Sequence, residues 1–494
     1  MVLISSTSSV RTIARRPRRC ILVLEKKSTQ VMLPINSYTS LQKSVLVMVL
    51  LNALSVPIML SSVNVALPHI AADLELSALS VSWIPTAFLM ASAMFILVFG
   101  RLADMFGRKK IFLIGAVSVV FASILASLAT GAVSLIGARF LQGVGAAMLY
   151  ATQMAIVSSV FPLATRGRVI GLVISFIYIG LASGPLFGGI IVDQLGWRIN
   201  FLLQIPLAIL VFCIGFYKVE GDWAADERGV FDFTGALIYC LAIFIICIGA
   251  SFLPSSIGYV LMVAGLIGVG IFFRQARSSN HPLLDVKLFF TNRTFTFSAL
   301  ASLIMYSATF MNVVLLSLYL QYLKGLSPSA AGLIMMIQPL TMAVFSPLMG
   351  KLSDSIEPRI LSSAGMFVTA MGLVLLGMLN SNSQTSNIAI ALVVTGLGFS
   401  LFSSPNVNAI MSSVSRKHLG AAAAAVSTTR ILGQLFSMVL ITLIMALTFG
   451  ATQIEPANYF ELEKTIRFSF YLAAGLCVPG LFLSAVRGTI HSRQ

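Results

Sequence analysis

A short polar turn between two long apolar runs reads Gly100-Arg-Leu-Ala-Asp104-Met-Phe-Gly107-Arg108-Lys109-Lys110. A looser copy follows 250 residues later and reads Gly350-Lys-Leu-Ser-Asp354-Ser-Ile-Glu357-Pro-Arg359. Both keep a glycine, a cation, a leucine and an aspartate in the same order. A second pair lies at nearly the same offset, Ala155-Ile-Val-Ser158-Ser159 and Ala409-Ile-Met-Ser412-Ser413. Two such pairs indicate that the chain contains one structural unit twice.

The composition is that of a membrane protein. Of the 494 residues, 58% are hydrophobic and 10% are charged, whereas soluble domains contain roughly 25% charged residues. Apolar runs long enough to cross a bilayer recur along the chain, which predicts an all-α membrane protein. Short loops leave no room for a soluble domain between the expected spans, which are 44–66, 81–100, 111–131, 134–160, 168–192, 199–218, 233–253, 255–273, 295–322, 328–349, 360–380, 387–411, 419–449 and 466–487.

The distribution of cations predicts the orientation of these spans. The formal net charge is +16, and most of the 32 Lys and Arg fall in the basic leader or in loops on its side of the membrane. The opposite side has only Arg198, Lys324, Lys464 and Arg467. Because positive loops stay in the cytoplasm, we expect both termini inside and the protein in the plasma membrane. The charge thus indicates a lipid bilayer as partner and not a nucleic acid.

The repeat predicts the architecture. A shift of 250 residues brings the first span onto the ninth, so spans 1–6 match spans 9–14 and the seventh and eighth form an inserted central pair. An even number of spans in each half makes the halves parallel repeats. We therefore expect five regions: a disordered cytoplasmic leader at 1–43, with Met1 or Met32 as the start, a six-helix bundle at 44–218, a linker with two extra helices at 219–294, a second bundle at 295–487 and a cytoplasmic tail at 488–494.

The turn at 100–110 resembles the signature between the second and third helices of the major facilitator superfamily. That resemblance implies a major facilitator fold, with a substrate site between two six-helix repeats. A carboxylate near a helix end can bind a helix N-terminus or a neighbouring cation in one state and release it in another. The alternative is a basic turn with a solvated aspartate. We predict a conformational switch that comprises Gly100, Arg101, Asp104, Gly107, Arg108 and Asp354.

The fifth span carries a pattern of small residues, Gly171-(x)8-Gly180-(x)3-Gly184-Pro185-(x)2-Gly188-Gly189. Small residues at this spacing let another helix approach closely, and Pro185 removes one backbone hydrogen bond. The alternative is that these residues only provide a general packing surface between helices. The full spacing, however, resembles the signature of exporters in the same superfamily, which implies efflux by antiport.

The fourth span begins with Arg139-Phe-Leu-Gln142-Gly143-Val-Gly145, which resembles the fourth-helix signature of the superfamily. The matching arginine of that signature is linked to proton transfer. An arginine in hydrocarbon normally faces a cavity or a partner, and snorkelling to the interface is the alternative. The candidates for proton coupling are Arg139, Asp104 and Asp193.

Two further stretches, Asn64-Val-Ala-Leu-Pro68 and Trp197-Arg198-x-Asn200-Phe201, resemble the fourteen-span drug:proton antiporters. That branch usually has an aspartate five residues before the asparagine, where this chain has Met59. All 16 Asp and Glu fall in loops or at span ends, whereas Arg139 and Arg430 fall within spans. The departure puts cationic drugs in doubt. It favours neutral or anionic lipophilic substrates, or a proton path through Asp104 or Asp193.

Polar residues inside the spans are candidates for lining a substrate cavity, and hydrogen bonding between helices without substrate contact is the alternative for each. They are Asn64, Gln142, Gln153, Asn312, Gln338, Asn406, Arg430 and Gln434.

Other classes of function have little support. The five cysteines form no CxxC pattern, and the histidines fall in expected loops or termini, at His69, His281, His418 and His491. We therefore predict no catalytic residue, metal or cofactor. No Walker loop is present, so ATP is not expected as the energy source. We interpret the chain as a secondary transporter that exports small lipophilic compounds by proton antiport. The alternatives are an exporter of a specific lipid or metabolite, or an uncoupled facilitator.

Overall fold

The expected membrane spans are helices in the computed structural model, which describes residues 38–224, 230–279, 282–284, 286–414 and 419–488. In this part of the chain, 14 helices are long and apolar enough to cross a membrane. The predicted all-α fold class and number of spans are confirmed. Most of the leader, including Met1 and Met32, and residues 489–494 of the tail lie outside the described residues.

The helices follow one another with short connections, and several spans consist of two consecutive segments. Their bounds are α1 Ser40–Asp73, α2 Ala78–Phe106, α3 Arg108–Ser127, α4 Ala132–Val160, α5 Leu163–Leu195, α6 Trp197–Leu202, α7 Gln204–Lys218, α8 Phe233–Ser251, α9 Ser256–Ser278, α10 Val286–Thr291, α11 Arg293–Thr309, α12 Met311–Leu318, the π-helical turn η2 Tyr319–Leu323, α13 Pro328–Met335, α14 Ile337–Leu352, α15 Pro358–Gly377, α16 Thr385–Ser412, α17 Leu419–Thr448, the 3₁₀ turn η4 Pro456–Asn458 and α18 Tyr459–Val486.

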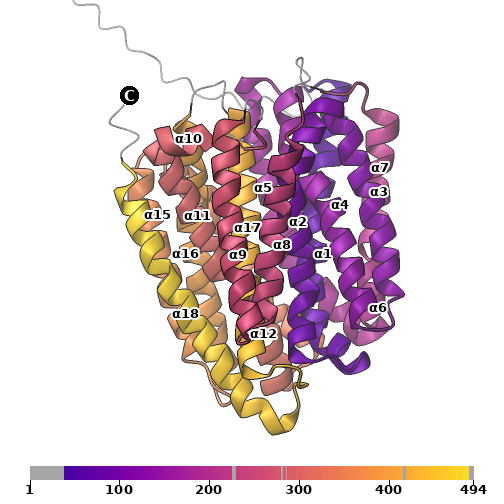
Figure 1. Cartoon of the computed structure of the whole chain (residues 1–494), viewed down its shortest axis with the longest axis vertical. Helices are drawn as coiled ribbons and strands as arrows, with labels where there is room; N and C mark the ends of the chain where they lie inside the picture. The colour runs from indigo at the N-terminus through magenta and orange to yellow at the C-terminus, as the bar shows by residue number, and fades with distance from the viewer. Residues whose placement is uncertain (1–37, 225–229, 280–281, 285, 415–418, 489–494) are drawn as a thin grey trace, which may run out of the picture. The chain divides into compact units, whose positions relative to one another are not determined.

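The helices from α1 to α18 form one bundle with two ends (Figure 1). One end, the upper one in Figure 1, contains the turn between α2 and α3, and we call it the Asp104 end. The opposite end contains the turn between α1 and α2, and we call it the far end.

The two halves repeat the same helix contacts. In the first half α1 packs on α5, α2 on α4 and α3 on α7. In the second half the corresponding pairs, α11 with α17, α14 with α16 and α15 with α18, also pack together. At the interface between the two halves, which we call the seam, α2 contacts α17, and α5 contacts α13 and α14. The second and fifth spans of each half therefore form the interface between the halves.

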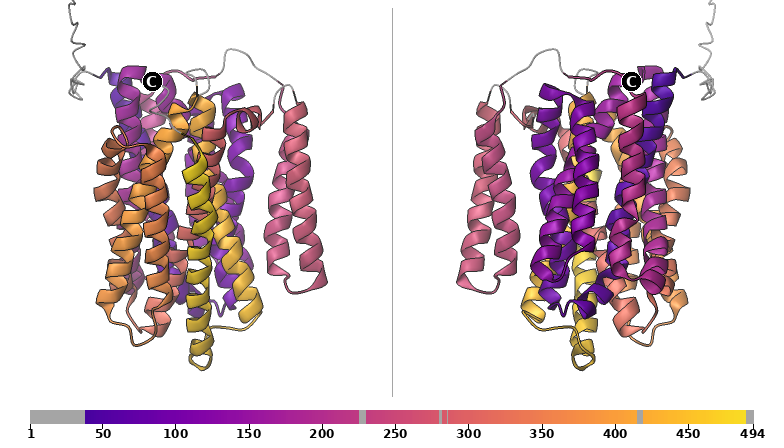
Figure 2. Two further views of the ribbon diagram at one scale, coloured as in Figure 1. Left: turned by 90° about the vertical axis from the view of Figure 1, so that its left-hand side faces the viewer. Right: turned by 90° about the vertical axis from the view of Figure 1, so that its right-hand side faces the viewer.

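The central pair, α8 and α9, is a hairpin at the side of the bundle (Figure 2). It packs on α2 and α17. Three side chains attach it to α2: the Tyr239 hydroxyl donates to the Ala93 carbonyl at 2.8 Å, Cys240 Sγ to the Met94 carbonyl at 3.3 Å, and Trp83 Nε1 donates from α2 to Ser251 Oγ at 2.9 Å.

Three details differ from the sequence-based expectation. The first span does not end near Pro68, because helical bonding continues to the hydrogen bond from Leu74 N–H to Ile70 O at 3.0 Å. His69 consequently lies in α1 and not in a loop, although its side chain is exposed. The ninth span is interrupted at Phe310 and ends in a π-helical turn. His281, His418 and His491 lie outside the described residues.

Candidate functional site

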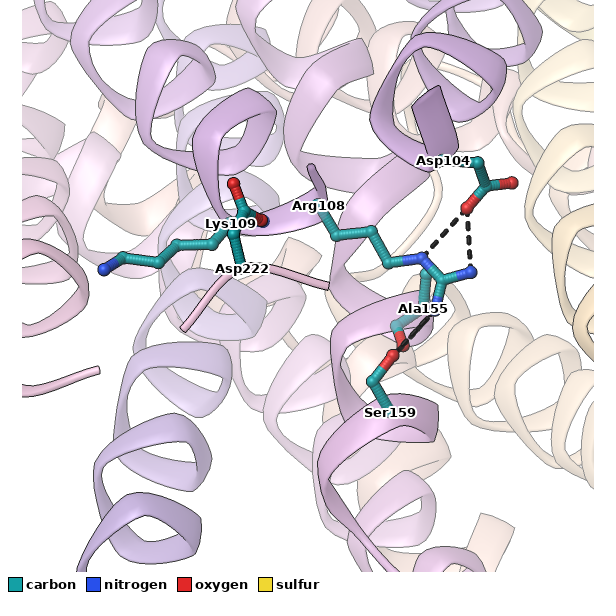
Figure 3. Close-up of polar contacts among 6 residues, drawn as sticks. All are labelled: Asp104, Arg108, Lys109, Ala155, Ser159 and Asp222. Atoms are coloured by element: carbon teal, nitrogen blue, oxygen red, sulfur yellow. Dashed lines mark hydrogen bonds and ion pairs between the residues drawn. The ribbon is translucent and has the colours of Figure 1, made fainter. Parts of the chain in front are cut away.

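The turn between α2 and α3 holds its aspartate in an ion pair (Figure 3). Gly107 joins the two helices with φ = 111°, a value that favours glycine. Arg108, the first residue of α3, donates from Nε and Nη2 to Asp104 Oδ1 at 2.9 and 2.8 Å. Its Nη1 also donates to Ser159 Oγ of α4 at 2.6 Å. The pair thus connects α2, α3 and α4 within the first half.

A second carboxylate supports this turn and was not foreseen from the sequence. Asp222, in the connection after α7, accepts a hydrogen bond from Lys109 N–H at 2.9 Å (Figure 3). A Cβ added at Gly107 would collide with the Asp222 carboxylate. Asp222 therefore explains, together with the backbone angle, why residue 107 is glycine. An acidic residue in a loop on the same side as three consecutive cations was the available signal.

The other predicted residues of the switch lie at the same end of the bundle. Gly100 and Arg101 are in the last two turns of α2, and Asp354 is exposed just after α14. A Cβ at Gly100 would lie 4.0 Å from its nearest neighbour, Ala151, so close packing does not require glycine there. The structure places the two copies of the turn in equivalent positions, and their role in gating stays a prediction.

The glycines of α5 form a close contact with α1. A Cβ at Gly180 would lie 2.6 Å from a backbone oxygen of α1, and one at Gly188 would lie 2.7 Å from Ser62 Cβ. A Cβ at Gly184 would collide with Ser61 Oγ. These glycines are four residues apart and therefore share one helix face, which lets the two backbones approach.

The same segment of α5 also contacts the other half. A Cβ at Gly189 would collide with the Pro328 carbonyl oxygen, and one at Gly332 with the Pro185 carbonyl oxygen. Gly171 differs, because no described heavy atom lies within 4 Å of a Cβ built there. The close packing is thus confined to the part of the predicted pattern that lies toward the far end.

Hydrogen bonds between described residues of the two halves are concentrated at the far end. They join Ala78 N–H to Thr452 O at 2.9 Å, Ser82 and Thr86 to Thr442 Oγ1 at 3.2 Å each, Gln321 Nε2 to Val65 O at 2.9 Å, Gln453 Nε2 to Glu75 O at 3.0 Å and Ser329 N–H to Asp193 Oδ2 at 3.0 Å. Another, between the Tyr178 hydroxyl and Ser403 Oγ at 2.9 Å, lies nearer mid-depth. The far end is therefore fastened across the seam.

Two carboxylates at the far end have different partners. Asp193 reaches across the seam to the first turn of α13, where the helix dipole favours negative charge. Asp73 stays within the first half, accepting from Arg198 Nη1 at 2.6 Å and from Trp197 Nε1 at 3.0 Å. This pair gives the predicted Trp197-Arg198 motif a local function, which is to join α6 to α1.

Arg139 is fully buried inside the first half, which differs from the snorkelling alternative. Its Nε donates to Ile84 O at 3.2 Å and its Nη1 to Gln142 Oε1 at 2.7 Å. Gln142 Nε2 in turn donates to Ser123 Oγ at 2.8 Å, and the guanidinium lies 4.6 Å from the centre of the Phe88 ring. The network connects α2, α3 and α4, whereas the seam between the halves is formed mainly by other faces.

Several cavity candidates form hydrogen bonds within their own half of the protein. Asn64 donates to a carbonyl one turn earlier in α1 at 2.9 Å. Gln153 Oε1 accepts from Asn52 Nδ2 at 2.6 Å, and Asn312 Nδ2 donates to Gln338 Oε1 at 3.5 Å. Both pairs connect two helices of the same half, and substrate contact for these residues stays a prediction.

Arg430 is the candidate that faces the seam. Its guanidinium on α17 lies 5.5 Å from the centre of the Tyr150 ring on α4, which belongs to the other half. The side chain is half-buried, and Gln434 is buried one turn further along α17. The two halves therefore meet around this arginine near mid-depth.

A buried network at the Asp104 end was not foreseen from the sequence. Arg487 is the last residue of the expected span 466–487, and its side chain is only 1% exposed. Its Nη1 donates to Asn406 Oδ1 at 2.6 Å and to Ser298 Oγ at 3.2 Å, and its Nη2 donates to Ser362 Oγ at 3.2 Å. Asn406, predicted to line the cavity, is thus part of a network that joins α11, α15 and α16 to the residue after α18. Polar residues near the ends of α11, α15 and α16 were the only signal for this network.

Comparisons with known proteins give one family. The model described as Major Facilitator Superfamily matches residues 49–272 and 298–491. Riboflavin transporter RibZ of Clostridioides difficile (strain 630) is 29% identical over 424 residues, covering 86% of this chain and 92% of that protein. Multidrug resistance protein Stp of Mycobacterium tuberculosis (strain CDC 1551 / Oshkosh) is 29% identical over 410 residues, covering 82% and 75%.

Solved structures show the same fold. A POT family transporter crystallised with a thioalcohol conjugated peptide superposes with a TM-score of 0.68 at 15% identity. The match covers 90% of this chain and 96% of the transporter. At this level of identity the likeness concerns the fold alone.

Proposed function

The chain belongs to the major facilitator superfamily of membrane transporters, and from this premise we propose that it exports small lipophilic compounds in exchange for protons. Transport would proceed by alternating access, in which the two halves rock about a site between them. We place the protein in the plasma membrane with the Asp104 end in the cytoplasm, following the cation distribution.

The observation that carries this proposal is the fastening of the far end. Hydrogen bonds across the seam, including those from Ala78, Gln321 and Ser329, lie on the side that the proposal makes extracellular. A transporter closed outside presents its central site to the cytoplasm, which is where an exporter collects its cargo. Rocking would have to break these contacts to release the cargo.

The close contacts of α5 support the direction of transport. The glycines of α5 bring this helix against α1, and Gly189 of α5 together with Gly332 of α13 brings it against the other half. A pattern that resembles the exporter signature thus lies at the contact that must open for release. Relatives named as multidrug proteins, such as Stp, favour lipophilic compounds as cargo.

Among the proton-coupling candidates, Asp193 has the contact best suited to the role. Its carboxylate joins the two halves, so protonation would remove the negative charge that the α13 N-terminus attracts. Asp104 and Arg139 have their partners within the first half. A proton that arrives from outside would then weaken the closure of the far end.

A second candidate function is transport of one specific metabolite without coupling to protons. Two observations favour it. All 16 Asp and Glu fall outside the interiors of the expected spans, and the relative RibZ is named a riboflavin transporter. A protein of this kind would move its cargo down a gradient by the same rocking motion.

The test uses proteoliposomes that contain a pH-sensitive dye. We would impose a proton gradient and add cationic, neutral and anionic lipophiles to the intact protein, to Asp193→Asn and to Asp232→Asn. Asp232 is a matched control, because it also accepts from a backbone N–H at the start of a helix, that of Gly235 at 2.8 Å, but this bond lies within one segment and does not join the two halves.

Antiport predicts proton movement triggered by at least one compound in the intact protein and in Asp232→Asn, with a several-fold loss in Asp193→Asn. Uptake of a compound without proton movement would replace antiport by facilitated transport. Equal proton movement in the three proteins would remove Asp193 from the coupling mechanism.

A further inference from the structure

Arg430 occupies an unusual position for a charged side chain. It lies 11 residues after the first residue of α17, Leu419, which is about 16 Å along a helix. It is also at the seam, because its guanidinium faces the Tyr150 ring of the other half at 5.5 Å. A side chain at this depth and between the halves is placed to meet cargo.

The described part of the chain provides no counter-charge for this arginine. The ion pairs between described residues are Arg108 with Asp104, Arg198 with Asp73 and Lys464 with Glu461, and all three lie near helix ends. The other two arginines buried in the bundle, Arg139 and Arg487, each donate at least two hydrogen bonds to side chains or carbonyls, although Arg139 Nη2 and Arg487 Nε have no partner in this part of the chain. Among the described residues, Arg430 has no hydrogen bond or ion pair, and its guanidinium makes a cation–π contact with the Tyr150 ring.

Charged side chains within membrane spans are rare, and they normally face the bundle interior or a water-filled cavity, where they mark substrate pathways. The five N–H donors of Arg430 have the geometry to bind a carboxylate or another planar anion in bidentate fashion. Retaining such a group at the seam therefore favours an anionic partner that arrives from outside the chain.

Aromatic side chains of both halves pack together beside α17. Tyr178 of α5 packs into a cluster with Phe399, Met305 and Met342 of the second half, and Tyr306 of α11 packs against the same cluster. The rings of Tyr306 and Phe399 meet edge to face, with centroids 5.4 Å apart. Tyr306 lies close to α17, because a Cβ built at Gly433, three residues after Arg430, would lie 2.7 Å from Tyr306 Cβ. Flat rings and adaptable methionines suit planar ligands.

We propose that Arg430 binds the negative group of a planar aromatic anion at the seam, with the ring system of the ligand against Tyr150 of one half and Tyr306 of the other. This inference rests on the proposed function for its meaning in transport, because it names the substrate class of the same site. Binding itself can be tested without transport.

The probes are three compounds of one shape and different charge: 2-naphthoate, its neutral amide 2-naphthamide, and the cation 2-naphthylmethylammonium. Binding to the full chain in phosphatidylcholine nanodiscs would be measured by equilibrium dialysis, with empty nanodiscs to subtract partitioning into lipid. The variants are Arg430→Gln, Arg430→Lys and the control Arg293→Gln. Arg293 also lies near an aromatic ring, Phe297 at 5.4 Å, but at the end of α11.

We expect 2-naphthoate to bind most tightly to the intact protein and to Arg293→Gln. Arg430→Gln should weaken this binding about tenfold to a hundredfold, which is the usual value of a hydrogen bond to a charged group. Arg430→Lys should keep part of the affinity, because lysine retains the charge and loses the planar fork. The amide should bind Arg430→Gln and the intact protein alike.

Equal affinity of the intact protein for the three compounds would overturn the inference, whether or not Arg430→Gln folds. Loss of 2-naphthoate binding when phosphatidylglycerol is added to the nanodiscs would assign the arginine to an anionic lipid and overturn it as well. Charge-selective binding without proton-coupled export would refute the proposed function and leave this inference standing. Proton-coupled export of neutral or cationic compounds, unaffected by Arg430→Gln, would refute this inference and leave the proposed function standing.

Discussion

A single methyl group at Gly332 should disturb the closure of the far end. In the structure, a Cβ at this position would collide with the carbonyl oxygen of Pro185, which belongs to the other half. The obstacle is backbone, so no rotamer change relieves it. Overpacking of this kind costs about 1–3 kcal/mol. Because the strain disappears when the halves separate, Gly332→Ala should shift the equilibrium toward the open far end by roughly 5-fold to 150-fold.

The assay follows the accessibility of one introduced thiol. Ser82 is 3% exposed and lies 3.2 Å from Thr442 of the other half, so Ser82→Cys is shielded while the far end is closed. The five native cysteines would be replaced first. The labelling rate with a water-soluble maleimide, measured on purified protein, should rise in Gly332→Ala by up to the same factor.

The control is Gly475→Ala. Gly475 is exposed within α18, and no described heavy atom lies within 4 Å of a Cβ built there. Equal labelling rates for Gly332→Ala and Gly475→Ala, with both proteins monodisperse, would refute the argument that contact between α5 and α13 closes the far end.

Three further perturbations test the remaining networks. Asn406→Leu removes the acceptor 2.6 Å from the buried Arg487 guanidinium. The free energy of unfolding should fall by about 1.5–3 kcal/mol, which lowers the midpoint of thermal unfolding. An unchanged midpoint would contradict a stabilising role for the network. Gly107→Ala places a Cβ at positive φ against a carboxylate, which should cost at least about 1–2 kcal/mol and reduce the yield of folded protein, while Gly100→Ala should not; equal yields would show that the turn can relax. Asp104→Asn breaks a partly exposed ion pair that contributes about 0–1 kcal/mol, so unfolding should change little while transport falls; full transport would remove Asp104 from the switch.

Features that depend on the period or the order of residues could be predicted from the sequence. Apolar runs of sufficient length can satisfy their backbone only as helices in a membrane, and the two copies of the Gly100–Lys110 turn place the second half on the first. The glycines of α5 are a similar case, because their four-residue spacing fixes one helix face and therefore a close contact. All of this information lies within a single helix or turn.

Features that depend on which segments meet could not be predicted in this way. Asp222 supports the turn at Gly107 only because the connection after α7 returns to α3, and nothing in its own neighbourhood indicates that partner. Arg487 lies at the end of the last span like any cytoplasmic cation, yet three helices bring Ser298, Ser362 and Asn406 to it. For the same reason, Arg139 and Arg430 look equivalent in the sequence, although one lies inside a half and the other at the seam.

The attachment of the α8–α9 hairpin bears on how a twelve-helix plan could gain two helices. Two of its three bonds to α2 end on backbone carbonyl oxygens, those of Ala93 and Met94. Every residue type offers such an acceptor, so these bonds demand no particular side chain from the helix that receives the hairpin. An ancestral gene could therefore have acquired the pair as an insertion between its duplicated halves with little matching change elsewhere, and later substitutions at Ala93 or Met94 would leave these two acceptors in place.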